Sequence, residues 1–473
     1  MSGAETSSSG SYGSVRLGKD ESSPGNSTAF TAVLIIADVA GAGILSIAVP
    51  VAKLGWLAGG LLGTACFVLN LHVSMMLWRT FMCRPRVRSY GELAAAVFEG
   101  EPDWLQRWVP TAVYILQGSF MFSLLGLFVL ITGKALGMMF YDISLCLPRW
   151  CSFACFLILP LAVGGERLGS WNPLIWMNSL LLWGTIFIPL IHMASRGVER
   201  TGPPHSNFDA ITPDTSFATM LTGVGDFAFV TTGQSMLVEI MAEMRSPEEL
   251  PTAYVRYSMP FQLVAMSIIG FGGYYYKGSA MMGMVNDNLP FGLWFRIAAL
   301  LLMSHMVITY IVKNTVLCKS VAVACAGRAN ERMNERNIWF FLNVVVLLTA
   351  WLMSQAIPFF TDLVDLLGAT LTPVVCWIIP IMLYVRCHYS HLGDVRISLV
   401  EWGAIGLEVT LSIVLLCVGP YHVSKHIIAD WGTYGAPFDC HCEGIWATCA
   451  CSRDHDGMEG LCPVPALVFS LGE

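Results

Sequence analysis

Charged side chains are scarce in this 473-residue sequence, where Asp, Glu, Lys and Arg together make up 12% of the chain. A soluble domain carries about 25% charged residues, because its surface has to interact with water. Hydrophobic residues make up 55%, and the mean hydropathy is +0.62. So few charges cannot cover the surface of soluble domains of this total length. The composition therefore indicates a protein with several membrane-spanning segments.

The sequence also lacks a basic excess, a secretory signal and a dense set of cysteines. Its 26 basic and 33 acidic residues give a net charge of −7, which leaves no positive excess for binding nucleic acid. The first 28 residues are polar and rich in Ser and Gly, unlike a signal peptide. Fifteen cysteines in 473 residues are about 3% of the chain, below the density of a disulfide scaffold. We expect an integral protein of the plasma membrane or of a vacuolar or endosomal membrane, and no nucleic-acid partner.

Eleven stretches are long and apolar enough to cross a lipid bilayer as helices, which takes about 20 apolar residues each. Their apolar runs are continuous rather than alternating, which excludes a β-barrel. The predicted spans are residues 30–52, 56–80, 110–133, 147–165, 171–194, 217–241, 257–276, 291–317, 338–358, 363–385 and 397–419. The expected fold is therefore an all-α polytopic membrane protein with about 11 transmembrane helices.

The distribution of Lys and Arg predicts the orientation of these spans, because basic residues gather on the cytoplasmic side. With the N-terminus inside, sixteen Lys and Arg residues fall on inner flanks and nine on outer flanks. Residues 1–28 would then form a disordered cytoplasmic tail, and residues 421–473 a Cys-containing exosolic tail. The tail cysteines, odd in number, do not fit a standard zinc spacing, so we expect no metal site there, although His441 and His455 leave that alternative open.

Two of the predicted spans are interrupted by glycines and carry an acid. The first contains Asp38, Gly41 and Gly43, and on its own this pattern fits ordinary small-residue packing. The sixth contains Gly223, Gly225, Asp226, Thr231, Thr232 and Gly233. Two such spans, five apart, are typical of two five-helix halves related by an inverted repeat, with broken helices at a binding site near mid-membrane. The N–H groups freed at a break bind anionic groups such as carboxylates.

Four ordered segments resemble the amino acid/auxin permease family (the amino acid transporter transmembrane domain), within the amino acid–polyamine–organocation superfamily. They are GAGILSIAVPVAKLGWLAG (41–59), GDFAFVTTGQSMLVEIMAEMRSP (225–247), GGYYYKG (272–278) with DNLP (287–290), and FFTDLVDLLGATLTPVVCWIIP (359–380). The resemblance runs over roughly residues 29–420, which would form the transmembrane transporter domain. It implies a leucine-transporter-type 5+5 inverted repeat plus one extra helix, and a secondary transporter of amino acids rather than an enzyme.

The resemblance also implies where the substrate binds. The expected substrate-binding residues are Ala40, Gly41, Ala42, Gly43, Ile44, Phe229, Val230, Thr231, Thr232 and Gly233. The N–H groups of Ala42, Gly43 and Ile44 would bind the carboxylate, and the carbonyls of residues 229–231 the amine. Thr231 and Thr232 would shape the side-chain pocket. Three polar residues of the third span are candidates for that pocket or for interhelical hydrogen bonds, namely Tyr114, Gln117 and Ser119.

Asp38 is the expected proton-coupling group, because burial in hydrocarbon favours its protonated form. The alternative is a structural role, with Asp38 ionised and bonded to Lys313 or to a neighbouring helix; Lys313 itself is expected to extend to the membrane interface. Several sodium-coupled members of the family that the chain resembles have an amide side chain where this chain has Ala37, so the resemblance favours protons as the coupling ion.

Other titratable residues in the spans are assigned lesser roles. We expect Glu239 and Glu243 to be hydrated or to pair with Arg245, with a role in gating as the alternative. The role of His305 and Tyr310 stays open. The expected function is proton-coupled symport of small neutral amino acids by alternating access, with no cofactor besides the co-transported H⁺ or Na⁺. The alternatives are a sodium-coupled or exchanging carrier of another amine-containing solute, and an amino-acid-sensing receptor of transporter ancestry.

Overall fold

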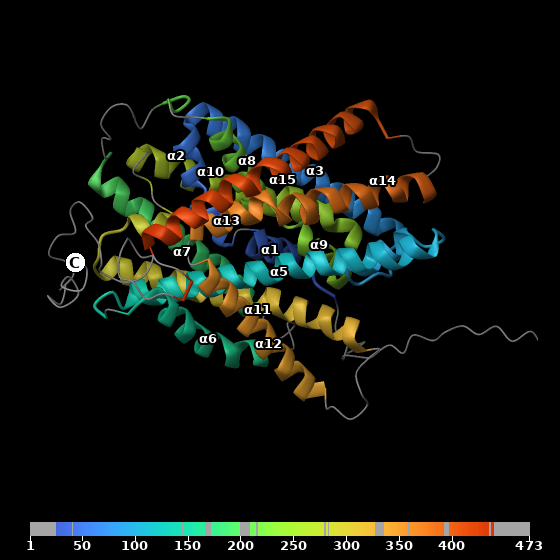
Figure 1. The fold of residues 1–473 in the computed structure, drawn as a ribbon, viewed down its shortest axis with the longest axis horizontal. Helices are drawn as coiled ribbons and strands as arrows, with labels where there is room; N and C mark the ends of the chain where they lie inside the picture. The colour runs from blue at the N-terminus through green and yellow to red at the C-terminus, as the bar shows by residue number, and fades with distance from the viewer. Residues whose placement is uncertain are drawn as a thin grey trace, which may run out of the picture.

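The computed structural model describes a helical protein. It covers residues 25–39, 41–143, 145–165, 172–198, 209–213, 216–278, 281, 283–326, 335–357, 360–391, 397–434 and 437–438. Among these residues there is no β-strand, and one isolated bridge joins Asn26 to Met244. Figure 1 shows the helices running roughly alongside one another in an elongated bundle. The unbroken helices are α3 (Trp56–Cys83), α4 (Tyr90–Val97), α5 (Asp103–Met139), α6 (Leu147–Gly164), α7 (Asn172–Arg196), α10 (Met259–Lys277), α11 (Leu293–Ala326), α12 (Glu335–Ala356) and α15 (Leu399–Tyr434).

Long apolar helices confirm an integral membrane protein. In the described part of the chain, eight helices are long and apolar enough to cross a membrane, and nine if one bent pair counts as a single span. The eight coincide with the second to fifth and the eighth to eleventh predicted spans, and the bent pair with the first. An all-α polytopic fold is therefore confirmed, while the count of eleven spans and the inverted repeat stay predictions.

The first and sixth spans are broken where the sequence predicts. The first consists of α1 (Thr28–Val39), the 3-10 turn η1 (Ala42–Ser46) and α2 (Ala48–Leu54), and its two halves are bent by 50°. The sixth consists of α8 (Phe217–Val230) and α9 (Gln234–Glu243), separated by a non-helical segment at residues 231–233. Glycines and threonines at these positions favour the break, because they stabilise a helix interior poorly.

A third irregular helix lies in the region of the tenth predicted span. Helix α13 (Phe360–Ala369) leads into the wide π-helical turn η7 (Pro373–Ile378) and then into α14 (Ile379–His391). Pro373 lacks the backbone N–H that a regular α-helix would use here. This irregularity brings η7 against α9 and α15, on one side of the sixth-span break.

The broken helices lie inside the bundle, and unbroken helices surround them. Every residue from Phe30 to Val39 of α1 is buried, as is every residue from Gln234 to Met241 of α9. Outer helices expose large apolar side chains, for example Phe156 of α6, Phe341 of α12 and Ile413 of α15. Apolar outer faces of this kind fit contact with lipid.

The end of the last helix differs from the predicted boundary. Helix α15 continues to Tyr434, whereas the sequence places the end of the last span at residue 419 and the start of the tail at residue 421. Cys146, directly before α6, is disulfide-bonded. Residues 1–24 and the tail residues that raised the question of a metal, Cys440 to Cys462 with His441 and His455, lie outside the described residues.

Candidate functional site

The breaks of the first and sixth spans touch each other. A Cβ atom added at Gly43 would lie 3.2 Å from the Cα of Val230 and 3.4 Å from the Cε1 of Phe229. Such distances are tighter than ordinary carbon–carbon contacts of about 3.5–4.0 Å. The missing side chain of Gly43 is therefore what lets η1 approach the end of α8.

A cavity lies beside this contact. Its volume is about 30 Å³, and since a water molecule needs roughly 10–15 Å³ on this measure, it has room for about two waters. It is lined by Asp38, Val39, Gly41, Gly43, Phe120, Leu124, Leu127, Phe128, Phe229, Val230, Thr232, Ser235 and Lys313. Five of the predicted substrate-binding residues are among these, namely Gly41, Gly43, Phe229, Val230 and Thr232.

The other predicted substrate-binding residues have different surroundings. Ile44 is buried, and its N–H donates to the carbonyl of Gly41 at 3.3 Å. The Thr231 hydroxyl donates to the Phe227 carbonyl at 2.8 Å. The N–H of Gly233 donates to the side-chain oxygen of Gln234 at 3.1 Å. Ala40 lies outside the described residues, and for Ala42 only the backbone is described.

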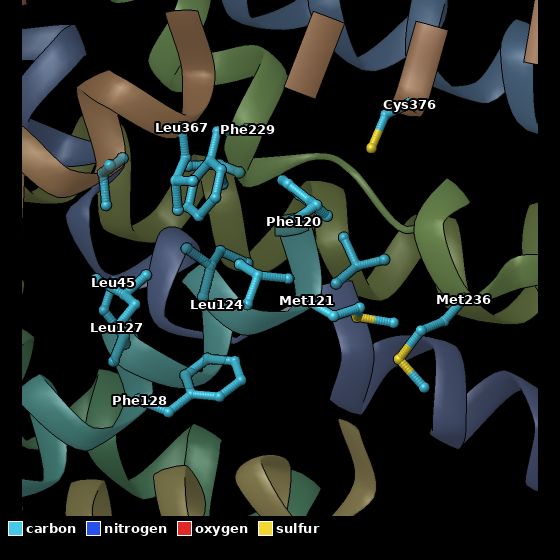
Figure 2. Close-up of a cluster of buried hydrophobic side chains, with 14 of the residues drawn as sticks. Leu45, Phe120, Met121, Leu124, Leu127, Phe128, Phe229, Met236, Leu367 and Cys376 are labelled. Carbon is cyan, nitrogen blue, oxygen red and sulfur yellow. The ribbon is translucent and has the colours of Figure 1, made fainter. Parts of the chain in front are cut away.

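Helix α5 contributes an apolar wall to the cavity, which was not predicted from the sequence. Phe120, Leu124, Leu127 and Phe128 recur at helical spacing and face the cavity. In the view of Figure 2, Leu124 lies between Phe229 above it and Phe128 below it. This spacing of apolar residues was a signal in the sequence, but an ordinary buried helix face gives the same pattern.

The polar residues expected in that wall make hydrogen bonds elsewhere. Gln117 donates to the Ser235 carbonyl at 2.7 Å and to the Glu239 carboxylate at 2.9 Å. The hydroxyl of Tyr114 bonds that of Ser89 at 3.0 Å, and Ser119 is exposed. Of the two alternatives for these residues, the structure supports interhelical hydrogen bonding for Gln117.

Asp38 and Lys313 form a buried ion pair in the cavity wall. The Lys313 ammonium donates to the Asp38 carboxylate, and the side chains of Lys313 and Asp38 are only 4% and 2% exposed. The other carboxylate oxygen of Asp38 lies 3.5 Å from where a Cβ of Gly233 would be. Asp38 therefore joins the end of α1 to α11 and lies beside the start of α9.

The expectation that Lys313 reaches the membrane interface is wrong. Helix α11 continues to Ala326, so Lys313 lies about 20 Å before its end at about 1.5 Å per residue. A lysine side chain cannot cover that distance. Its ammonium instead lies between Asp38 and the Met236 sulfur, which is 3.7 Å away.

Asn70 of α3 organises the sixth-span break and was not identified from the sequence. Its amide nitrogen donates to the Ala228 carbonyl at 3.3 Å and to the Thr231 hydroxyl. Its side-chain oxygen accepts from Gln234 at 3.0 Å and from Trp377 at 2.8 Å. Hydrogen bonds to α8, α9 and η7 thus compensate polar groups that the break leaves inside the bundle.

Glu239 is held by neutral donors. Its carboxylate accepts from the Tyr90 N–H at 3.0 Å and from Gln117 at 2.9 Å. Of the two expectations for this residue, pairing with Arg245 is therefore wrong, and hydration stays a prediction. A second cavity, of about 40 Å³, is lined in part by Glu239 and Glu243. It lies toward the end of α9 that the sequence places on the cytoplasmic side.

His305 and Tyr310 of α11 lie in the packed interior of the bundle. Both side chains are fully buried, and the His305 Nδ1 is 2.7 Å from the Asn178 side-chain oxygen. Among the described residues, no group of three or more His, Cys, Asp and Glu side chains is arranged to hold a metal ion.

One known family matches most of the chain. The family described as transmembrane amino acid transporter protein matches residues 25–401, which include both broken spans, the cavity and the Asp38–Lys313 pair. It is a family of transporters rather than of enzymes, whose substrates are amino acids and whose members are embedded in a membrane. The chain therefore belongs to the amino acid/auxin permease family of transmembrane amino acid transporters.

Proposed function

We propose that this protein is a secondary active transporter that carries small neutral amino acids together with protons by alternating access. The observation that carries the proposal is the cavity between the two helix breaks, with a buried Asp–Lys pair in its wall. Broken helices offer unpaired backbone groups, and a buried ion pair offers a protonation switch.

The two helix breaks would recognise the backbone of the substrate. In η1 the N–H of Ile44 is used within the turn, so the N–H groups of Ala42 and Gly43 are the better donors for a substrate carboxylate. The carbonyls at the end of α8 would accept from the amine. The Phe229 carbonyl already accepts from the Thr232 hydroxyl at 2.8 Å, which leaves Val230 and Thr231 as the preferred acceptors.

The walls of the cavity favour a small and uncharged substrate side chain. Apart from the mutually neutralised Asp38 and Lys313, the lining side chains are apolar or carry hydroxyl groups. The phenyl rings of Phe120, Phe128 and Phe229 limit its size. An amino acid needs more room than about 30 Å³, so binding would require the segments around the breaks to separate. This requirement fits a closed conformation in an alternating-access cycle.

The Asp38–Lys313 pair favours protons over sodium as the coupling ion. A sodium ion at Asp38 would stand against the fixed ammonium of Lys313, and like charges in a poorly hydrated interior repel strongly. A proton on Asp38 instead removes the negative partner. An unpaired buried ammonium is unfavourable by several kcal/mol, which would drive the rearrangement that gives Lys313 new surroundings.

One proton per cycle is enough for useful accumulation of a neutral substrate. A membrane potential of about 100 mV contributes about 2.3 kcal/mol per charge. At about 1.4 kcal/mol per tenfold change, this supports a concentration ratio of roughly 40. A pH gradient would add to it.

Uptake into vesicles tests the proposal. The purified protein is reconstituted, and uptake of a panel of radiolabelled amino acids is measured at two pH values, with and without sodium. Accumulation of small neutral amino acids driven by an inward proton gradient, without sodium, is the expected result. Uptake only with sodium would support the sodium-coupled alternative, and binding without uptake would support a receptor.

The same assay tests the role of Asp38. Asp38→Asn should abolish accumulation driven by a pH gradient, because the amide cannot titrate, while exchange of substrate at equal pH continues. A variant that still concentrates substrate down a pH gradient would make Asp38 structural.

A further inference from the structure

A second charged cluster lies on the other side of the sixth-span break, and the proposed function does not use it. Lys53 of α2 lies 3.8 Å from a carboxylate oxygen of Asp226 in α8 and 3.9 Å from one of Asp365 in α13. The Asp226 side chain is only 5% exposed, the Asp365 side chain 12% and the Lys53 side chain 32%. We call Lys53, Asp226 and Asp365 the outer cluster, because the predicted orientation places them toward the outer face.

Close packing of two glycines forces the two carboxyl groups together. A Cβ atom at Gly368 of α13 would lie 2.5 Å from the carbonyl oxygen of Gly225 in α8, so these helices touch along their backbones. Asp226 follows Gly225, and Asp365 lies one turn before Gly368. The carboxyl groups of Asp226 and Asp365 consequently face the same ammonium, with one oxygen of each within 4 Å of the Lys53 nitrogen.

The outer cluster lacks the donors that two carboxylates would need. One oxygen of Asp226 and one of Asp365 are buried without a hydrogen-bond partner. Lys53 is too distant from either carboxylate to donate a normal hydrogen bond. One ammonium also cannot neutralise two carboxylates. Two carboxyl groups that face one ammonium, each with a buried oxygen that lacks a donor, provide a binding site for a proton.

Other charged groups around the outer cluster do not supply the missing charge. On α13, Asp362 is a further carboxyl group acting on Lys53. On α15, Glu408 pairs with His72 of α3 at 2.8 Å, and the exposed Lys425 lies over the ring of Tyr421. On α3, the Cys66 thiol donates to the Val224 carbonyl. The nearby charges therefore add to the negative excess.

We infer that Asp226 and Asp365 share one proton when α2, α8 and α13 are packed as in this structure. The inference rests on the proposed function, since it names a second proton-binding group for the same transporter. A proton taken up from the outer side would be needed to close this end of the bundle. Acidification outside would then promote closure over the substrate, separately from the titration of Asp38.

Thermal stability as a function of pH tests the inference without any transport. In the folded protein the two carboxyl groups would hold one proton, and on unfolding both would ionise and release it. The free energy of unfolding should therefore increase as the pH falls from 8 to 6. The contribution to Tm is about 1 °C per pH unit for a chain of this size. Asp226→Asn and Asp365→Asn should each lose this contribution.

Asp142→Asn is the matched control, because Asp142 pairs with Arg296 at 2.5 Å in an exposed position. It should keep the dependence of Tm on pH that the unmodified protein shows. If both neutral variants of the outer cluster keep it as well, the shared proton is refuted. If neither variant can be purified in folded form, the inference also fails, because an amide mimics the protonated carboxyl group that it assigns to the fold.

Uptake separates failure of this inference from failure of the proposed function. With internal pH and membrane potential fixed, the initial rate of uptake should rise as the outer pH falls. In Asp226→Asn that rise should be smaller, because only the proton gradient acting through Asp38 then remains, while Asp142→Asn keeps the full rise. A protein without amino acid uptake at any pH would contradict the proposed function, and the Tm measurement would still decide on the shared proton.

Discussion

Removing one partner of the buried pair Asp38–Lys313 should destabilise the protein far more than removing both. Asp38→Asn leaves the Lys313 ammonium without a negative partner, and Lys313→Met leaves the Asp38 carboxylate without a positive one. Each side chain is at most 4% exposed, so water cannot take over the lost interaction. The double variant contains neither charge and should recover most of the stability.

The structure gives the size of the effect. Breaking a buried ion pair by removing one partner costs about 3–5 kcal/mol. With an unfolding entropy of about 2.1 cal/mol/K per residue, a chain of 473 residues loses about 1 °C in Tm for each kcal/mol. Each single variant should therefore melt about 3–5 °C below the unmodified protein, and the double variant within about 2 °C of it.

A double-mutant cycle on the purified protein in detergent measures the coupling. Met236→Leu is the control, since it removes only the 3.7 Å contact of the sulfur with the Lys313 ammonium and no charge. If the two single effects add within about 0.5 kcal/mol in the double variant, the two side chains do not act on each other. The assignment of Asp38 as a switch controlled by Lys313 would then be refuted.

Three further predictions concern the cavity and the break. Gly43→Ala should reduce uptake about tenfold, whereas Gly41→Ala should leave uptake near normal. The added Cβ lies 3.2 Å from Val230 in the first variant and no closer than 3.7 Å to any atom in the second. Uptake is compared at equal surface expression, and equal rates for the two variants would contradict the contact between the breaks. Asn70→Leu should cost about 2 kcal/mol, measured by thermal unfolding, since it leaves the buried indole N–H of Trp377 in η7 unpaired. An unchanged Tm would show that water replaces Asn70. Phe128→Ala should allow larger neutral amino acids to compete for uptake, and an unchanged competition profile would mean that this ring does not limit the substrate.

The sequence predicts the helices and the breaks well, because both depend on local chemistry. Long apolar runs favour helices wherever lipid removes the competing hydrogen bonds to water. The breaks at Gly41–Gly43 and at residues 231–233 follow from residues that stabilise a helix interior poorly. The structure places α1 and α2 on either side of the first break, and α8 and α9 on either side of the second.

The partners of buried polar residues were harder to predict, since tertiary packing decides them. Lys313 and Asp38 are 275 residues apart in the chain, and the predicted end of the eighth span at residue 317 suggested that the interface was within reach. Asn70 is a single polar residue in an apolar span, and its sequence neighbours do not indicate that it bonds α8, α9 and η7. The apolar residues of α5 that line the cavity have the spacing of any buried helix face, so the sequence alone did not show that they face a cavity.

The two charged clusters differ in balance, and this difference determines how each responds to protons. Asp38 and Lys313 are one acid and one base, so they need no proton while they are in contact. The outer cluster has two acids and one base, and it therefore needs a proton to remain closed. Asp226 lies one turn before Phe229, so a movement of α8 that separates Asp226 from Asp365 also moves a wall of the cavity. Because binding equilibria that share one conformational change are reciprocal, a substrate that favours the closed cavity must also strengthen binding of the proton at the outer cluster.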